Sequence, residues 1–511
     1  MNSATLTFDS QPAPAPLPIR GFAAAGIAER WLGDERRWGL AVLATALLQL
    51  TLIWTHAPWL DEWQALQLAL QSPDLRALLG NLRYEGHPPL WYLLLRGAAV
   101  VVPPAFVLPA VQTVIALALQ ALILFRAPFA RTERLLVATS FFLLFDYGTL
   151  SRSLSLGVLL ATAAFVFRRH PLGWAAIALL PFADFLFGVL SMICVALRLR
   201  DRDISIPGLA AWGLCGVLSA ISVIPAKDTI PALWLNGLPA DAYLFVTRLS
   251  VLLVPLHGPQ FGLQWNQPLP EAIAILAGPL FLMLGSRLTR AVPLHHGLYL
   301  GFAALLFAFS VTVYPLAIRH LSLLAMLVIL LRWWTPEAQR AASAGLFTGW
   351  MAVASLCGLI TAGVSFVRPF DTAGQAAAYI KAHHLLDKHW LVFPDSRAQG
   401  VSALTGMEFT RLEKDCAQSF IRWDHRGTIN SQAQLDAELR RATAKFGRSY
   451  LLTDFAVHPG HDPRLYRLLT HVPAGYDGQA YYLWMVAPDL PERAARPPQC
   501  APTPRLPLKV G

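Results

Sequence analysis

The sequence predicts an all-α polytopic membrane protein with a small soluble α/β domain at its C-terminus. Of the 511 residues, 55% are hydrophobic and 14% are charged, whereas an average soluble domain has about 25% charged residues. Several uncharged stretches approach or exceed the roughly 20 apolar residues that cross a bilayer. These stretches are residues 38–59, 105–125, 206–226, 298–318 and 344–367. After residue 367 the composition becomes that of a soluble domain.

The basic residues predict how the chain is oriented. The formal charge is +10, from 41 Lys and Arg against 31 Asp and Glu. Because the arginines cluster in short loops between apolar stretches, we interpret them as cytoplasmic orientation signals and expect no nucleic-acid partner. We expect residues 1–35, which are rich in Pro and Ala, to be a disordered cytoplasmic tail. The loop after Trp59 then lies outside.

The apolar run 89–102 is an exception among the hydrophobic stretches. If it crossed the membrane, the basic residues 126–134 would lie outside and break the charge rule. It is short and bounded by prolines, so we expect an interfacial or re-entrant helix and a large outer loop over residues 59–104. With a second non-crossing segment between residues 242 and 256, about eleven transmembrane helices result. The transmembrane domain covers 36–367, and the tail 368–511 lies outside.

The tail is predicted to be an α/β domain. It contains no Gly-rich phosphate loop, HExxH, CxxC or GxSxG motif. Cys416 and Cys500 could pair if the domain is extracytoplasmic. The expected helices are 372–384 and 432–446, and the expected strands are 390–393, 450–453 and 481–486.

The outer loop has the most informative chemistry. Asp61 and Glu62 follow the first span, and Glu85, His87 and Tyr92 belong to the run Glu-Gly-His-Pro-Pro-Leu-Trp-Tyr. Carboxylates at the membrane surface lose solvent, which raises their pKa and makes them better bases. The alternative for the acidic pair alone is a helix end whose charges meet lipid headgroups. Oxygen ligands here could also hold a divalent cation, a question that the sequence leaves open; no metal site is assigned.

A second candidate segment is the predicted outer turn that contains Asp146, Tyr147 and Arg152. An arginine there can hold an anionic phosphate, and the alternative is a turn that contacts lipid headgroups. Asp184, between two short helices, is expected to be a solvated helix cap.

A third segment contains Tyr314, Arg319 and His320 at the outer end of a span. An arginine on the outer side opposes the positive-inside trend, which favours a functional interpretation over an orientation signal.

These motifs together resemble those of the GT-C membrane glycosyltransferases, in particular bacterial relatives of dolichyl-phosphate-mannose protein mannosyltransferases and lipid A aminoarabinose transferases. The resemblance covers residues 38–334 and implies that Asp61 is the catalytic base with Glu62 beside it. The Pro-Pro-aromatic run of the family matches residues 88–92. The family's outer Arg-x-Tyr turn matches Arg152 only in part, because Leu154 replaces the aromatic residue. The late Arg-Tyr or Arg-His pair corresponds to residues 319–320.

The resemblance implies a glycosyltransferase of the cell inner membrane that acts at the outer face. Its donor would be a polyprenyl-phosphate sugar, and its acceptor a hydroxyl of an unknown protein, lipid or glycan. No cofactor is required in this interpretation, because arginines can replace a metal when the leaving group carries one phosphate. Two alternatives stay open: a transporter or flippase for a lipid-linked or envelope substrate, and a non-catalytic envelope scaffold.

Overall fold

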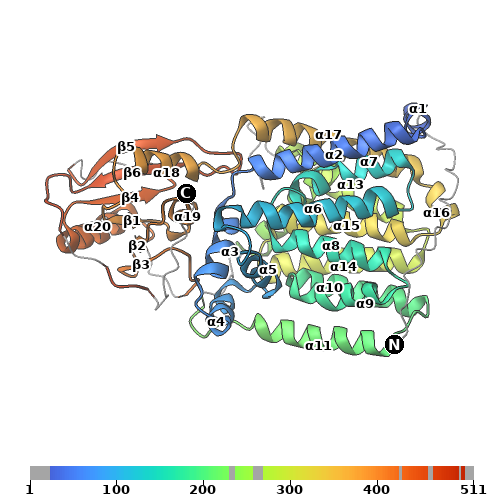
Figure 1. Cartoon of the computed structure of the whole chain (residues 1–511), viewed down its shortest axis with the longest axis horizontal. Helices are drawn as coiled ribbons and strands as arrows, with labels where there is room; N and C mark the ends of the chain where they lie inside the picture. The colour runs from blue at the N-terminus through green and yellow to red at the C-terminus, as the bar shows by residue number, and fades with distance from the viewer. Residues whose placement is uncertain are drawn as a thin grey trace.

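A computed structural model describes residues 23–229, 236–256, 269–424, 429–457, 464–493 and 497–500. Helices build one end of the molecule, and a sheet domain formed by the C-terminal part of the chain builds the other (Figure 1).

The helices of the bundle vary widely in length. Those before residue 130 are α1 (Ala23–Leu32), α2 (Glu35–Thr55), α3 (Leu60–Gln71), α4 (Leu75–Glu85), α5 (Leu90–Ala98), η1 (Pro104–Phe106) and α6 (Val107–Arg126). The middle of the chain forms α7 (Arg131–Ala138), η2 (Phe141–Asp146), α8 (Ser153–Val166), α9 (Pro171–Leu179), η3 (Leu180–Phe182), α10 (Phe185–Arg200), α11 (Ile206–Ser222) and α12 (Leu238–Leu253). The last are α13 (Glu271–Thr289), α14 (Pro293–Thr312), α15 (Ile318–Trp334), α16 (Glu337–Ala341) and α17 (Ala344–Val367).

Five helices in the described part of the chain are long and apolar enough to cross a membrane. They are α2, α6 with η1, α13, α14 and α17. Four of the five apolar stretches expected to span are among them; the fifth forms α11, which has 17 residues and is shorter. Among the described α-helices, α15 is the most buried, and its Ile318–Trp334 segment has no exposed side chain. The protein is therefore a membrane protein with a closely packed helical core.

Two short segments, the run 89–102 and the tail 1–35, had specific predictions from the sequence. The run expected to lie along the membrane forms α5, whose nine residues extend only about 14 Å at 1.5 Å per residue. That length is too short for a crossing. The tail 1–35, expected to be disordered, includes helix α1, so the expectation is wrong for Ala23–Leu32; residues 1–22 lie outside the described part.

The C-terminal domain is a three-layer α/β structure. Its helices are α18 (Ala373–Ala382), η4 (Asp395–Arg397), α19 (Gln399–Thr405) and α20 (Gln432–Phe446). Its strands are β1 (Trp390–Val392), β2 (Phe409–Arg411), β3 (Cys416–Gln418), β4 (Ser449–Thr453), β5 (Tyr466–Val472) and β6 (Tyr481–Val486). The strand order is β3-β2-β1-β4-β6-β5; β1 is parallel to β2 and β4, and the remaining pairs are antiparallel.

Alternation along the strands explains why helices cover both faces of this sheet. Side chains of neighbouring strand residues point to opposite faces, so Trp390 and Val392 pack with α18 and α19, whereas Leu391 packs with α20. The expected helices and strands of this domain are present. Strands β2, β3 and β5 and helix α19 were not anticipated.

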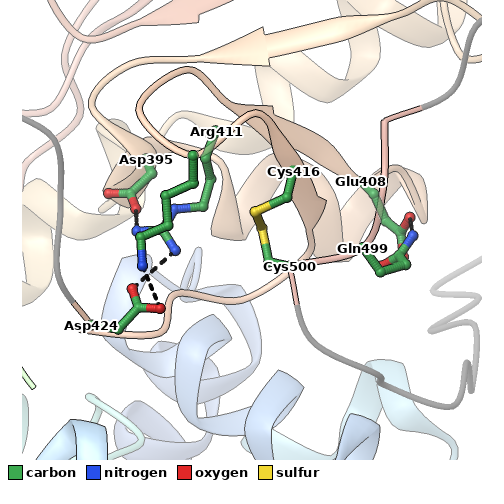
Figure 2. Close-up of a disulfide and its surroundings, with 8 residues drawn as sticks. Asp395, Glu408, Arg411, Cys416, Asp424, Gln499 and Cys500 are labelled. Carbon is green, nitrogen blue, oxygen red and sulfur yellow. Dashed lines mark hydrogen bonds and ion pairs between the residues drawn. A yellow bond between two sulfur atoms is a disulfide. The ribbon is translucent and has the colours of Figure 1, made fainter. Parts of the chain in front are cut away.

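A disulfide joins Cys416 of β3 to Cys500 near the end of the described chain (Figure 2). Beside it, Gln499 donates a hydrogen bond to Glu408 at 2.7 Å. The pairing that the sequence left conditional is thus formed, and it fixes the C-terminal segment to the edge of the sheet.

Candidate functional site

Asp61 lies in the first turn of α3, where the chain leaves α2 and turns across the end of the bundle. The carboxylate of Glu62 accepts a hydrogen bond from the Trp59 backbone N–H at 3.1 Å. This bond satisfies a backbone donor at the start of α3, which is a common way to begin a helix. The cap leaves the Asp61 side chain directed away from Glu62 and toward two arginines.

The Asp61 carboxylate contacts two guanidinium groups that come from distant parts of the chain. Its Oδ2 atom lies 2.8 Å from Arg319 Nη2 and 3.4 Å from Arg152 Nη2. Arg152 also donates from Nη1 to the Asp61 carbonyl oxygen at 2.7 Å. Arg152 caps the start of α8 and Arg319 is in the first turn of α15. All three segments predicted from the sequence therefore meet at one point.

The two arginines control the charge of Asp61. Burial alone raises the pKa of this carboxyl, but the guanidinium groups of Arg152 and Arg319 outweigh burial and lower the pKa to about 2. The carboxylate is therefore ionised at neutral pH. While both arginines contact it, it is also a weaker base than the desolvated carboxylate expected from the sequence.

Glu62, by contrast, is fully buried and has three contacts within the protein. Its Oε1 accepts a hydrogen bond from the Ser151 backbone N–H at 2.6 Å, and its Oε2 lies 2.7 Å from His56 Nε2 as well as capping α3. These contacts join the first loop to the turn before α8. The geometry favours a structural contribution from Glu62, although its expected place beside the catalytic base stays a prediction.

Glu85 lies at the end of α4 and faces the same site. Its Oε1 accepts a hydrogen bond from Gln64 Nε2 at 2.8 Å. Burial raises the pKa of Glu85, and the nearby His87 and the Gln64 bond only partly oppose that effect. Glu85 therefore holds a proton more tightly than an exposed glutamate and more tightly than Asp61.

His87 pairs with Asp184, for which the sequence predicts no more than a solvated helix cap. Its Nδ1 lies 3.2 Å from Asp184 Oδ2. Asp184 does cap a helix, because it accepts from the Leu186 N–H at 3.1 Å. It is 1% exposed, however, so the expectation of a solvated cap is wrong. A lone acid between apolar segments on the predicted outer face was the signal that could have identified it.

The remaining predicted site residues surround the Asp61 cluster, which consists of Asp61, Arg152, Arg319, Glu85 and His87. Tyr92 is buried and lies within electrostatic range of Glu85 and Arg152. The Tyr147 hydroxyl donates to the Arg319 carbonyl at 2.8 Å, and Asp146 is buried close to the Arg319 guanidinium.

Two more predicted residues lie in or just before α15. His320 is buried, and its ring stands edge-on to that of Tyr314 with centroids 6.3 Å apart. Electrostatic contact with Arg319 connects both to the cluster. All eleven predicted site residues thus lie at one end of the bundle.

The C-terminal domain contacts the loop that holds this site. Gln64 donates to the Ile421 carbonyl and accepts from the Ile421 N–H, both at 2.8 Å. Arg422 stacks over the Tyr84 ring at 4.1 Å. Since Gln64 also binds Glu85, one side chain connects the C-terminal domain to the site.

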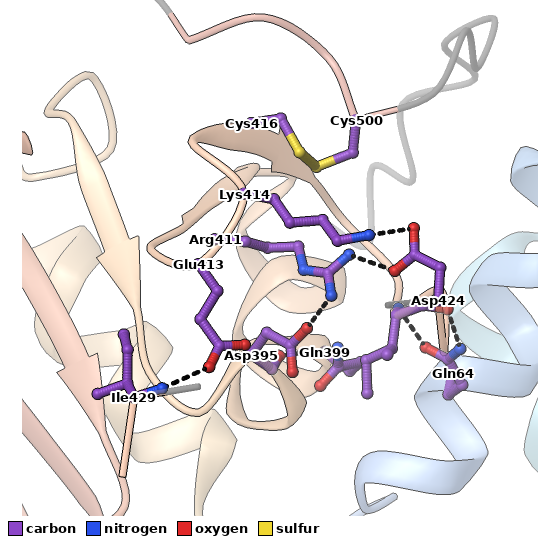
Figure 3. A network of polar contacts seen from close by, with 11 residues as sticks. Gln64, Asp395, Gln399, Arg411, Glu413, Lys414, Cys416, Asp424, Ile429 and Cys500 are labelled. Atoms are coloured by element: carbon purple, nitrogen blue, oxygen red, sulfur yellow. Dashed lines mark hydrogen bonds and ion pairs between the residues drawn. A yellow bond between two sulfur atoms is a disulfide. The ribbon is translucent and has the colours of Figure 1, made fainter. Parts of the chain in front are cut away.

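A buried ionic network holds the segment of the C-terminal domain that makes these contacts. Arg411 of β2, 2% exposed, lies 2.7 Å from Asp395 and 3.4 Å from Asp424 (Figure 3). Lys414 reaches the second oxygen of Asp424 at 2.5 Å. Asp424 follows closely on Ile421, so this network fixes the backbone that Gln64 binds.

The residues of the site do not fit a divalent cation at Asp61. Two guanidinium groups contact that carboxylate, and their positive charge would repel a metal ion. Within the described ranges, no three His, Cys, Asp or Glu side chains are grouped so that they could hold one ion. We therefore derive no step through a metal.

Comparisons with known proteins returned nothing: no family model, curated protein or solved structure matches the chain.

Proposed function

We propose that the protein transfers a sugar from a polyprenyl-phosphate donor to an acceptor hydroxyl at the outer face of the membrane. The observation that carries the proposal is the contact of Asp61 with both Arg152 and Arg319. A carboxylate that faces two arginines in a partly buried site combines a base with an anion-binding pair. Transfer from a lipid phosphate requires both of these groups.

The arginines bind the donor phosphate in this mechanism. A phosphate monoester or diester competes with the Asp61 carboxylate for the two guanidinium groups, which bind phosphate oxygens with good geometry. When the phosphate draws the arginines away, Asp61 loses the interactions that lower its pKa. Binding of the donor therefore makes Asp61 a stronger base at the moment when a base is needed.

The transfer step then balances as an inverting displacement. The acceptor hydroxyl gives its proton to Asp61, and its oxygen forms a bond to the anomeric carbon of the sugar. The bond from that carbon to the phosphate oxygen breaks, and its electron pair leaves with the polyprenyl phosphate. Arg152 and Arg319 stabilise the negative charge on this leaving group.

The proposed topology places this chemistry outside the cytoplasm. It has about eleven crossings of the cell inner membrane, a GT-C-like arrangement, a cytoplasmic N-terminus and an outer C-terminal domain. Two observations support it. The positive-inside rule places residues 126–134 inside, and the Cys416–Cys500 disulfide suits an oxidising compartment.

The test is Asp61→Asn in the purified full-length chain. Short-chain polyprenyl-phosphate hexoses and pentoses serve as donors, an envelope extract serves as the acceptor pool, and release of polyprenyl phosphate is measured. We expect at least one donor to be consumed and the variant to be slower by about 10² or more. Asp74→Asn is the matched control, because Asp74 caps α4 in the same loop through the Ala77 N–H at 2.7 Å and Asn caps equally well.

Full transfer by Asp61→Asn contradicts the proposed base. A transporter or flippase would give a different pattern: the sugar–phosphate bond of the donor would stay intact in the wild-type protein while the lipid moved between leaflets of a proteoliposome. A scaffold would show neither reaction.

A further inference from the structure

A hollow lies at the end of the helical bundle opposite the C-terminal domain. Its volume is about 620 Å³, within the range of ligand-binding pockets. The ends of α6, α8, α10 and α15 surround it together with α16, which lies at the far end of the bundle from the sheet (Figure 1). It is therefore remote from Asp61.

Four arginines and two carboxylates give this hollow a positive balance. The arginines are Arg126, Arg168, Arg200 and Arg340, and the carboxylates are Asp201 and Glu337. Asp201 is already bound, because it accepts from Arg200 Nε at 2.8 Å and from the Trp334 indole at 2.6 Å. Both of its carboxylate oxygens therefore already accept a hydrogen bond, and the carboxylate also attracts Arg168 electrostatically.

Three of the four arginines, namely Arg126, Arg168 and Arg340, have fewer contacts than Arg200, which pairs with Asp201. In the part of the chain that the structure describes, none of these three side chains forms an ion pair or donates a hydrogen bond. Arg168 stacks over the Trp334 ring, with its Cζ atom 5.3 Å from the ring centroid. A guanidinium group that stacks in this way can still donate hydrogen bonds from its N–H groups to a ligand. Helix C-termini attract arginines through their partial negative charge. That attraction does not explain why four arginines line the same open hollow.

The surroundings indicate which anion would enter. Trp333 and Trp334 end α15 beside the hollow, and tryptophans concentrate where a bilayer meets water. Phe125, next to Arg126, is 56% exposed on the apolar surface of α6, where a lipid acyl chain would lie. Basic pockets between helices at a membrane surface commonly bind anionic headgroups.

We propose that this hollow, lined by Arg126, Arg168, Arg200, Arg340 and Trp334, binds a phosphate ester, namely the headgroup of an anionic phospholipid. The arginines contact the phosphate, and the exposed apolar surface beside Phe125 contacts the acyl chain. The site is separate from the Asp61 cluster and does not depend on the reaction proposed there.

The test uses the full chain in a neutral detergent and measures equilibrium binding of three probes. They are short-chain phosphatidylglycerol, short-chain phosphatidylcholine and inorganic phosphate. We expect phosphatidylglycerol to bind tightest and its affinity to fall as salt rises. Loss of one interfacial arginine costs about five-fold, so Arg126→Gln with Arg168→Gln weakens phosphatidylglycerol by about 30-fold.

Matched controls come from the same end of the bundle. Arg169 and Arg290 do not line the hollow, and Arg169→Gln with Arg290→Gln should change the affinity by less than two-fold. If the first double variant does not fold, Arg126→Gln alone serves, because Arg126 is exposed; about five-fold weaker binding is then expected. The conservative Lys variants should retain most of the affinity.

Three outcomes overturn the proposal. The first is equal affinity for phosphatidylglycerol and phosphatidylcholine, which shows that headgroup charge has no effect. The second is unchanged phosphatidylglycerol affinity in the Gln variants. The third is inorganic phosphate binding as tightly as phosphatidylglycerol with the same loss in the variants, which would assign the hollow to a soluble phosphate and reject the lipid.

Discussion

Replacing Glu62 by alanine should destabilise the protein strongly, because the buried carboxylate has three partners. The Trp59 and Ser151 backbone N–H groups would each lose their acceptor, and a buried unsatisfied donor costs about 1–3 kcal/mol. His56 would lose a carboxylate at 2.7 Å. Removing one partner of a buried pair typically costs about 3–5 kcal/mol, so we expect the free energy of unfolding to fall by about 4 kcal/mol.

The assay is thermal melting of the purified chain at a fixed scan rate. A loss of that size should lower the apparent Tm by about 4 °C in a chain of this length. Glu62→Gln should melt between the wild type and Glu62→Ala, because its amide keeps one acceptor oxygen but places a second donor near the Trp59 N–H.

Glu35→Ala is the control for this series. Its side chain is 80% exposed and pairs with Arg131 at the surface, where an ion pair contributes less than about 1 kcal/mol. A Glu62→Ala protein that melts within 1 °C of the wild type would refute the structural assignment. A normally folded but inactive Glu62→Gln protein would restore Glu62 as a catalytic residue.

Two further predictions concern the C-terminal domain and its contact with the site. Gln64→Ala removes two hydrogen bonds to Ile421, which together contribute about 2 kcal/mol. Trypsin should then cleave the chain after Arg368 at least ten-fold faster than it cleaves the wild type. An unchanged cleavage rate would show that other contacts hold the domain. Burial and the neighbouring Asp371 raise the pKa of Asp477, so this carboxyl binds a proton more tightly in the folded chain than in the unfolded chain. The free energy of unfolding therefore falls as the pH rises above about 4. Asp477→Asn should abolish this fall and raise the Tm at pH 8 more than at pH 5, whereas equal shifts at both pH values would reject the assignment.

The bounds of a helix or strand could be predicted from the sequence where one local feature of the sequence defines them. An uninterrupted apolar run that ends at charged residues defines α17 as Ala344–Val367, and amphipathic spacing after Ser431 defines α20 as Gln432–Phe446. Strands β2 and β3 have three residues each and carry too little periodicity to be recognised. They form because β2 pairs with β1 and β3 pairs with β2, and that pairing is a tertiary effect.

The sequence by itself predicted that Asp61, Arg152 and Arg319 lie at helix ends on the same side of the membrane, because charge and hydropathy indicate on which side each loop lies. It could not determine which acid meets the arginines. Asp61 and Glu62 are adjacent and chemically alike, and only the packing of α3 against the turn before α8 directs one carboxylate to Arg152 and Arg319 and buries the other against backbone donors. The same packing brought Asp184 to His87 across almost a hundred residues of chain. A contact between residues so far apart in the chain cannot be predicted from local sequence, because it depends on how the helices pack.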